Sequence, residues 1–343
     1  MRWLIDSAVT YSELKPSSTV GEFDLIQRYF YELTAQHGVE LGIGDDAAVI
    51  SLDDNPLSRL VVSMDSLVSE IHFPSCSSAY DIARRSLCVN LSDMAAMGAT
   101  PRWFTLALNL PEQLAADEWL SGFSKGLGEI ANCHNCALIG GDVSRGNLAL
   151  SITIIGQIPA DQALTRKGAR PGDQIYVTGT LGDGAAALET LWSESEDPMV
   201  RRLCRHFFSP TPRIKEGVLL RDLASACIDI SDGLLSDLGH ICLKSAVGAE
   251  ITLSCLPVHS DLKTNFSKDF LDWALSGGDD YELCFTVPSG RVIEIDRLVR
   301  QGEIDATLIG RIVEGSDIAL VSDSGKQLIN KLGKKHRGYT HFA

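Results

Sequence analysis

Residues 42–50 read GIGDDAAVI, a stretch in which two adjacent aspartates follow glycines within a run of strand-forming apolar residues. A buried strand does not tolerate an unpaired carboxylate, because removing the charge from water costs more than the neighbouring apolar residues return. We therefore expect a positive partner beside Asp45 and Asp46. The alternatives are a Lys or Arg from elsewhere in the chain, water at a strand end, or a metal ion.

Strands and helices alternate along the chain on both sides of this stretch. RLVVSMDSLV (59–68) is typical of a second strand, which Asp65 interrupts. Further strands are predicted at 102–110, 148–158, 174–180 and 306–313, and helices at 22–36, 79–97, 114–132, 185–192, 214–226 and after Ser231, an expected N-cap. Alternation in both halves predicts a mixed α/β (α+β) protein with two sheets.

Length and composition set further limits. A chain of 343 residues exceeds one ordinary core, so two domains of roughly 150 residues are expected, and TRKGARPGD (165–173) has a linker's composition near mid-chain. The 45% hydrophobic and 22% charged residues are typical of a soluble globular protein. No apolar run reaches the roughly 18 residues of a membrane span, and Asp6 interrupts what would be a signal peptide. We expect a cytoplasmic protein.

Charge and cysteines exclude some classes of function. The net charge of -15 argues against nucleic acid and anionic membranes as partners, so cations would have to bridge an anionic substrate to this chain. The nine cysteines are scattered and do not suggest a disulfide framework. Cys133 and Cys136 form a C-x-x-C without a second pair, which favours core packing over a zinc or redox role.

Aspartates give the strongest chemical signal. They recur at turns and strand ends, namely at Asp45, Asp46, Asp65, Asp93, Asp142, Asp229, Asp232, Asp279 and Asp280. A single such residue usually bonds its own backbone in a turn, but the repetition favours a shared site. A site with oxygen ligands and without Cys or His suits Mg²⁺. Phosphate groups of the substrate usually complete the coordination of this ion. Walker A and protein-kinase signatures are absent, so nucleotide chemistry would use another scaffold.

Eight ordered segments resemble the thiamine-monophosphate kinase family. They are GEFDLI (21–26), GIGDDAAV (42–49), DSLVSEIHF (65–73), NLSDMAAMGATP (90–101), IGGDVSRG (139–146), LTRKGARPGDQIYVTGTLGD (164–183), DISDGLLSDLGHI (229–241) and SGGDDYELCF (276–285). The resemblance runs from Gly21 to Phe342. This family belongs to a superfamily of ATP-dependent enzymes that includes aminoimidazole ribonucleotide synthetase and selenophosphate synthetase.

The resemblance implies a fold and a reaction. The implied protein is a homodimer of two-domain subunits, with N-terminal-domain strands forming a barrel at the dimer interface. The expected division is an N-terminal extension (1–20), an ATP-binding, metal-binding and dimerisation domain (21–160), and a C-terminal α/β domain whose tail returns to the substrate site (161–343). The implied reaction converts ATP and thiamine monophosphate into ADP and thiamine diphosphate, with two or more Mg²⁺ ions in the cleft between the domains.

The family's functional residues map onto this chain position by position. The implied magnesium ligands are Asp46, Asp65, Asp93, Asp142, Asp229 and Asp232. The implied ATP contacts are Ser63, Met64, Gly141, Asp142, Arg166 and Ser231, the implied substrate contacts are His72, Asp279 and Tyr339, and the implied catalytic residues are Arg166 and Asp232. Two positions depart from the family pattern. Met64 stands where the family often has Thr, so a side-chain hydroxyl contact is lost. Asp279 stands where the family often has Glu, so its carboxylate reaches one methylene less far toward the substrate.

We expect direct in-line phosphoryl transfer. A phosphate monoester has a second pKa of about 6 and is already a nucleophilic dianion, so the barrier is repulsion between anions rather than deprotonation. Arg166 would hold phosphate oxygens bidentately, unless it is an ordinary loop arginine. His72 is either a substrate contact or a packed residue, and Tyr339 either stacks on a thiamine ring or packs within the tail. Asp229 and Asp232 bind metal or cap a helix.

Two other functions stay open. The first is another ATP-dependent superfamily member with a different acceptor, such as a purine-pathway amidine; DSLVSEIHF and GGDDYELCF favour the thiamine substrate, and a substrate panel would separate the two. The second is a non-catalytic protein that binds divalent metal for structure. An EF-hand loop is absent, and acids spread over residues 45–280 suit a cleft better than a local loop.

Overall fold

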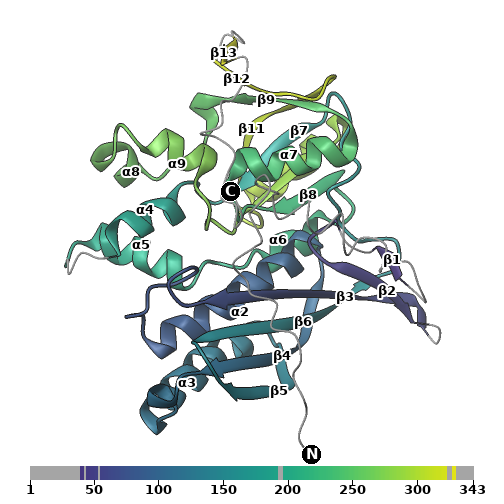
Figure 1. Cartoon of the computed structure of the whole chain (residues 1–343). Coiled ribbons are helices and arrows are strands. Elements are labelled where there is room, and N and C mark those ends of the chain that lie inside the picture. The colour runs from purple at the N-terminus through teal and green to yellow at the C-terminus, as the bar shows by residue number, and fades with distance from the viewer. Residues whose placement is uncertain (1–38, 42–43, 53–54, 192–195, 323–326, 330–343) are drawn as a thin grey trace, which may run out of the picture. The chain divides into compact units, whose positions relative to one another are not determined.

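The computed structural model describes residues 39–41, 44–52, 55–191, 196–322 and 327–329 (Figure 1). Its strands form two mixed sheets with helices packed against them, which confirms the predicted α/β class. The helix expected at 22–36 and the extension at 1–20 lie outside the described residues.

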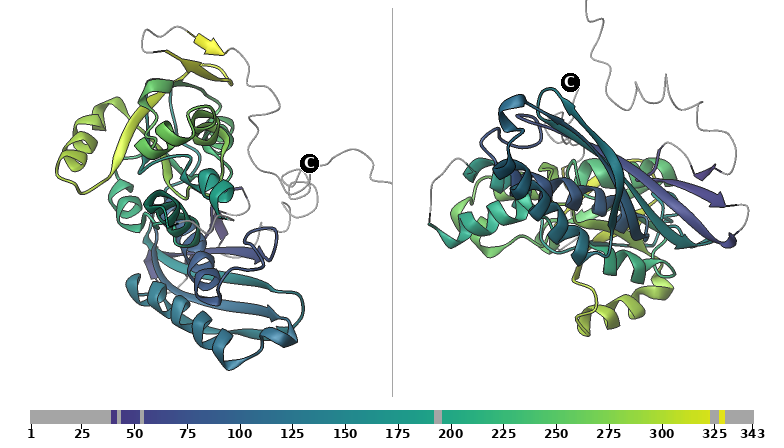
Figure 2. Two further views of the ribbon diagram at one scale, coloured as in Figure 1. Left: turned by 90° about the vertical axis from the view of Figure 1, so that its left-hand side faces the viewer. Right: turned by 90° about the horizontal axis from the view of Figure 1, so that it is seen from below.

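The first sheet has the strand order β1-β2-β3-β6-β4-β5. Its strands are β1 (Val39–Leu41), β2 (Ala48–Leu52), β3 (Asn55–Val68), β6 (Ala149–Pro159), β4 (Thr100–Leu110) and β5 (Ala137–Arg145). Neighbours are antiparallel except β4 and β5, which run parallel. Alternate side chains of β6, such as Ile152 and Ile154, are buried in the core beneath α2 (Ala79–Ala96) and α3 (Asp117–Cys133), which cover one face (Figure 2).

The other face of this sheet carries apolar side chains that no described residue covers. Met64 on β3 is 60% exposed. Trp103 on β4 is 37% exposed, and every residue of β5 is exposed. Groups of large exposed apolar residues are typical of interaction surfaces.

The second sheet has the order β13-β12-β9-β11-β7-β10-β8. Its strands are β13 (Gln327–Ile329), β12 (Ile318–Val321), β9 (Gly248–Thr252), β11 (Ala306–Val313), β7 (Gln174–Thr178), β10 (Leu283–Val287) and β8 (Ala226–Asp229). The helices in this part are α4 (Asp183–Thr190), α5 (Pro198–Phe208), α6 (Ile214–Leu220), α7 (Leu234–Ser245), α8 (Ser260–Asn265), α9 (Phe270–Ser276) and α10 (Val292–Arg300). Ile175 and Val177 of β7 face one apolar cluster while Tyr176 faces another, so the central strands are buried on both faces.

Helix α2 contributes to both cores and so connects the two sheets. Its residues Leu87 and Leu91 belong to the core of the first sheet, whereas Ala95 belongs to the cluster around β10. A Cβ at Gly217 of α6 would lie 2.1 Å from the Ala95 carbonyl oxygen, so only glycine allows α6 to approach this closely. This contact fixes the C-terminal half of α2 beside the second sheet.

Two local predictions are wrong. The helix expected at 214–226 ends at Leu220. The N-cap of α7 is Gly233, with a φ of 115°, rather than Ser231. The carboxylate of Asp237, inside the helix, accepts hydrogen bonds from the backbone N–H groups of Asp232 (3.0 Å) and Gly233 (3.1 Å), and this interaction replaces a cap from Ser231.

The buried cysteines agree with a packing role. Five of the nine are buried, including Cys136, whereas its C-x-x-C neighbour Cys133 is exposed. Among the described helices, none combines the length and the apolar character that crossing a membrane requires.

Candidate active site

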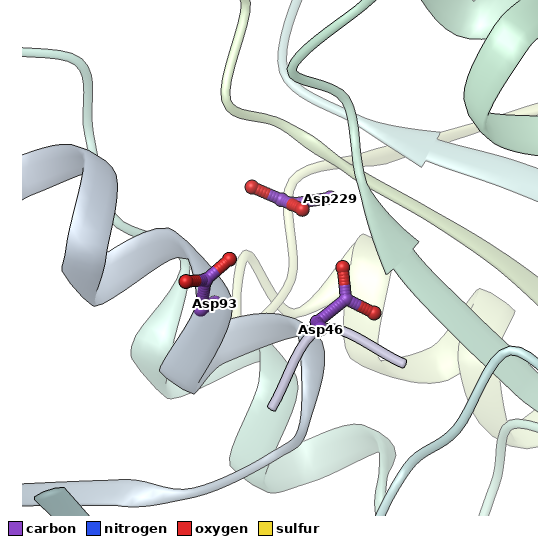
Figure 3. A group of neighbouring side chains, drawn as sticks. All are labelled: Asp46, Asp93 and Asp229. Atoms are coloured by element: carbon purple, nitrogen blue, oxygen red, sulfur yellow. The ribbon is translucent and has the colours of Figure 1, made fainter. Parts of the chain in front are cut away.

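Three aspartates from distant parts of the chain meet at the end of α2 (Figure 3). Asp46 follows the glycine turn before β2, Asp93 lies on α2, and Asp229 ends β8. One carboxylate oxygen of each lies within 4.8 Å of the others. Asp46 and Asp229 are buried, at 7% and 5% exposure. We call Asp46, Asp93 and Asp229 the three-aspartate group.

A single arginine partly balances this charge. Arg166 donates from Nε to Oδ2 of Asp46 (3.1 Å) and from Nη2 to Oδ1 (3.0 Å), which is a bidentate ion pair. The backbone N–H of Arg166 also donates to Oδ1 of Asp45 (2.9 Å). A guanidinium from elsewhere in the chain is thus one positive partner of the GDD run. Within the three-aspartate group, it offsets the charge of Asp46 alone.

Two serine hydroxyls orient the other carboxylates. Ser63 on β3 donates to Oδ2 of Asp93 at 2.6 Å and also lies 3.0 Å from the backbone oxygen of Asp46. Ser92 on α2 donates to Oδ2 of Asp229 at 2.6 Å. The rigid sheet and helix therefore hold the carboxylates in fixed directions, as a preformed site requires.

The buried position of these carboxylates disfavours their ionised forms. Burial raises the pKa of Asp93 well above its usual value, and repulsion from Asp65, Asp229 and Asp46 adds to the effect. Burial, and next the charge of Asp46, likewise raises the pKa of Asp229. A divalent cation would reverse both effects. All three donors are carboxylate oxygens, so the group fits Mg²⁺ rather than zinc.

Asp65 and Asp232 lie near this group. Asp65 lies on β3, its charge raises the pKa of Asp93, and its backbone N–H donates to Asn90 Oδ1 at 3.2 Å. Asp232 lies in the turn after β8. The pKa of Asp237 is raised mainly by burial and next by the charge of Asp232. The carbonyl of Ser231 in the same turn accepts from the Asp279 backbone N–H at 2.9 Å.

Three other predicted residues lie on the first sheet, outside the three-aspartate group. Asp142 on exposed β5 accepts a hydrogen bond from Ser144 at 2.7 Å. At Gly141 a Cβ would lie 1.9 Å from the Leu106 carbonyl oxygen, so this glycine permits the pairing of β5 with β4. Met64 is exposed, next to Ser63 in β3.

The predicted substrate contacts His72 and Asp279 are joined through a buried arginine. Nδ1 of His72 accepts a hydrogen bond from the Val68 backbone N–H at 3.0 Å. Arg85 of α2 donates to the His72 carbonyl oxygen (3.0 Å) and to Oδ1 of Asp279 (2.6 Å). Tyr339 lies outside the described residues.

Sequence reasoning missed two buried side chains and grouped a third, Asp280, with the recurring aspartates without assigning it a role. Arg85 and Asp237 look like ordinary helix residues, and only the fold reveals their buried partners. Asp280 is a capping residue: its carboxylate accepts from the backbone N–H groups of Gly182 (2.8 Å) and Gly184 (3.0 Å) at the start of α4. The turn interpretation therefore holds for Asp280.

Comparisons with known proteins agree with this fold. The family model for the N-terminal domain of AIR synthase related proteins matches residues 44–158, and the model for the C-terminal domain matches residues 170–323. A thiamine-monophosphate kinase from Salmonella typhimurium is 45% identical over 332 residues, covering 94% of this chain and 98% of the relative.

Two solved structures extend the comparison. Thiamine-monophosphate kinase from Stenotrophomonas maltophilia K279a is 43% identical, with a TM-score of 0.74, and the match covers 87% of this chain and 96% of that one. A structure described as AaThiL complexed with AMPPCP and TMP has a TM-score of 0.81 at 31% identity, covering 94% of this chain and 97% of that one. With these similarities along nearly its whole length, the chain belongs to the thiamine-monophosphate kinase family of AIR synthase related proteins.

Proposed function

We propose that this protein is an ATP-dependent kinase that phosphorylates thiamine monophosphate to thiamine diphosphate. The observation that carries the proposal is the three-aspartate group, in a chain with 45% identity to a thiamine-monophosphate kinase. An oxygen-only acidic site suits Mg²⁺ bound to the phosphates of ATP. A related structure that binds AMPPCP and TMP supports both substrates.

The three-aspartate group would hold Mg²⁺, together with Asp65 and Asp232, and we propose two or more ions. When bound, Mg²⁺ neutralises phosphate charge and aligns the two anions for in-line transfer. The acceptor phosphate is largely a dianion at neutral pH, so no side chain has to remove a proton. Arg166 already points its guanidinium at Asp46, and it stabilises charge on the transferring phosphoryl group from that position.

Binding of the two substrates is divided among the remaining predicted residues. We assign Ser63 and Ser231, with Arg166, to the ATP side, and His72 and Asp279 to thiamine monophosphate. The roles of Tyr339 in substrate binding and of Asp232 in catalysis belong to the same proposal.

The uncovered face of the first sheet supports a homodimer. Met64 and Asp142, both predicted ATP-site residues, lie on strands β3 and β5 of this sheet and are exposed. A second copy that covers this face would bury Met64 and Trp103 and bring the predicted barrel together. We further propose that the protein acts in the cytoplasm and that the domain division falls at residues 160–161, after β6.

The decisive experiment measures ADP release by purified protein with ATP, Mg²⁺ and thiamine monophosphate. Controls replace the acceptor by thiamine or by other phosphate monoesters, and an Asp46→Asn variant removes one carboxylate of the three-aspartate group. Turnover only with thiamine monophosphate, abolished in the variant, supports the proposal. ATP binding without turnover would overturn the assigned acceptor, and Mg²⁺ binding without any effect of ATP or ADP would overturn the kinase assignment.

A further inference from the structure

Arg85 is a fully buried arginine that connects three segments of the chain. It is 2% exposed, and each of its three guanidinium nitrogens donates one hydrogen bond. Nε donates to the His72 carbonyl oxygen (3.0 Å), Nη1 to the Phe207 carbonyl oxygen (2.7 Å), and Nη2 to Oδ1 of Asp279 (2.6 Å). Its Cζ lies 3.9 Å from the centroid of the Phe207 ring. Packing and hydrogen bonds thus fix the guanidinium in one orientation.

Asp279 depends on this arginine for its orientation. Its φ of 67° lies in the left-handed region, which residues other than glycine seldom adopt and which aspartate tolerates better than most. On its N-terminal side, a Cβ at Gly278 would lie 2.4 Å from the Ser231 carbonyl oxygen, so the loop lies directly against the turn that follows β8. The loop fixes the backbone of Asp279, and Arg85 fixes its carboxylate.

One oxygen of the Asp279 carboxylate is left for another donor. Arg85 binds Oδ1, whereas Oδ2 has no hydrogen-bond partner among the described residues. The side chain is 22% exposed, while that of Arg85 is 2% exposed. A ligand can therefore reach the carboxylate but not the arginine.

We propose that Arg85 is a positioning residue for the acceptor: it aims the free oxygen of Asp279 at a hydrogen-bond donor of the thiamine moiety and holds the His72 turn beside it. This inference rests on the proposed function, because it takes Asp279 and His72 as acceptor contacts. The aspartate side chain is short, so without Arg85 it cannot extend to bring a misdirected carboxylate back to the acceptor. Losing the arginine therefore weakens acceptor binding and leaves the metal site assembled.

The neighbouring arginine provides a matched control. Arg84 donates to Tyr80, to Glu129 (3.0 Å) and to Ser209 (2.9 Å), and none of these is a predicted site residue. Arg84→Met and Arg85→Met remove the same charge from adjacent positions of α2. A difference in kinetics between them reports the buried contacts of Arg85 rather than the loss of a positive charge from α2, and the double variant with Asp279→Asn isolates the Asp279 contact.

The test compares steady-state kinetics of the wild type, Arg85→Met, Arg85→Lys, Arg84→Met and Asp279→Asn. We expect Arg85→Met to raise KM for thiamine monophosphate by roughly 10- to 100-fold, which corresponds to the loss of one hydrogen bond between the acceptor and the charged Asp279 carboxylate. KM for ATP should stay within about twofold of the wild type. Arg85→Lys restores part of the loss, and Arg84→Met matches the wild type. Combining Arg85→Met with Asp279→Asn adds little to either change alone.

Other outcomes separate this inference from the proposed function. An active wild type whose KM for thiamine monophosphate is unchanged in Arg85→Met overturns the positioning role alone, as does an equal rise of KM for both substrates. If Arg85→Met does not fold, Arg85→Lys is the deciding variant. The positioning role is overturned if Arg85→Lys has the wild-type KM for thiamine monophosphate and if its effect on KM adds to that of Asp279→Asn in the double variant. A wild type that binds ATP but does not turn over thiamine monophosphate overturns the proposed function, and this inference with it.

Discussion

Replacing Asp93 by Asn should stabilise the metal-free protein while abolishing its activity. Asp93 lies within 4.8 Å of two other carboxylates, and burial raises its pKa well above the usual value. Asparagine has nearly the same shape, and its Oδ1 can still accept the 2.6 Å hydrogen bond from Ser63. The substitution therefore removes the repulsion and preserves the local geometry.

The magnitude follows from the geometry of the group. At 4.8 Å and an effective dielectric constant of about 20, two unit charges repel by about 3.5 kcal/mol. Proton uptake by the raised-pKa carboxylates and the nearby Arg166 reduce this, so we expect a gain of about 1–3 kcal/mol in the free energy of unfolding. At about 1–2 °C per kcal/mol for a chain of 343 residues, Tm should rise by about 1–5 °C.

Calorimetry in EDTA, and again with Mg²⁺ and ADP, measures both halves of the prediction. The wild type should gain stability from Mg²⁺ with ADP, because a ligand that binds only the folded state raises Tm, and Asp93→Asn should gain much less. Asp142→Asn is the control for the EDTA measurement. Its carboxylate is exposed on β5, so its Tm in EDTA should stay within about 1 °C of the wild type.

A lower Tm for Asp93→Asn than for the wild type in EDTA would refute the reasoning. It would mean that the negative charge of Asp93 is net stabilising without metal, as part of an internal ion-pair network centred on Arg166. An equal Tm gain from Mg²⁺ with ADP in both proteins would also contradict the assignment of Asp93 to the metal site.

Three further predictions concern other parts of the chain. Arg166→Met should lower kcat/KM by about 100-fold or more in steady-state assays, with Arg166→Lys intermediate, because only a guanidinium pairs with Asp46 in two places. Burial lowers the pKa of His240 from 6.5 to about 4, so on acidification this side chain is protonated in the unfolded chain before it is protonated in the folded one. The wild type therefore loses stability as the pH falls from 7 to 5. Denaturant titrations should show that His240→Gln loses about 2 kcal/mol less over this range than the wild type does. Gly126→Ala should cost about 1–3 kcal/mol in the same titrations, because its Cβ would lie 2.3 Å from a backbone oxygen of α2, whereas Gly128→Ala meets nothing within 4 Å and should be neutral or slightly stabilising.

The sequence predicted the parts of the fold that local patterns determine. The expected strands at 102–110 and 148–158 correspond to β4 and β6, and the expected helix at 79–97 corresponds to α2, with shifts of one or two residues. The three-aspartate group was among the residues singled out from the recurring aspartates and the family resemblance. Its assembly from positions as distant as Asp46 and Asp229 required the packing of two sheets around α2.

The missed residues have no local signature. An arginine on an amphipathic helix is normally solvent-exposed, so nothing near Arg85 in the sequence indicates three buried acceptors. Asp280 shares the acidic-turn pattern of Asp279, yet one caps α4 and the other faces Arg85. Which of two adjacent carboxylates points into a site depends on the φ of the turn, and the residue types do not determine that angle.

The close contact between the loops at 229–233 and 278–282 limits how acceptor specificity in this chain can change. Backbone hydrogen bonds join Ile230 to Glu282 and to Tyr281, and a glycine at position 278 leaves no room for a side chain between the loops. Under the proposed assignment of Asp229 to metal and Asp279 to the acceptor, main-chain contacts between the two loops set the distance between these two sites. Lengthening either loop would misalign both substrates at once, so a new acceptor is reached through the length and direction of the side chain at position 279.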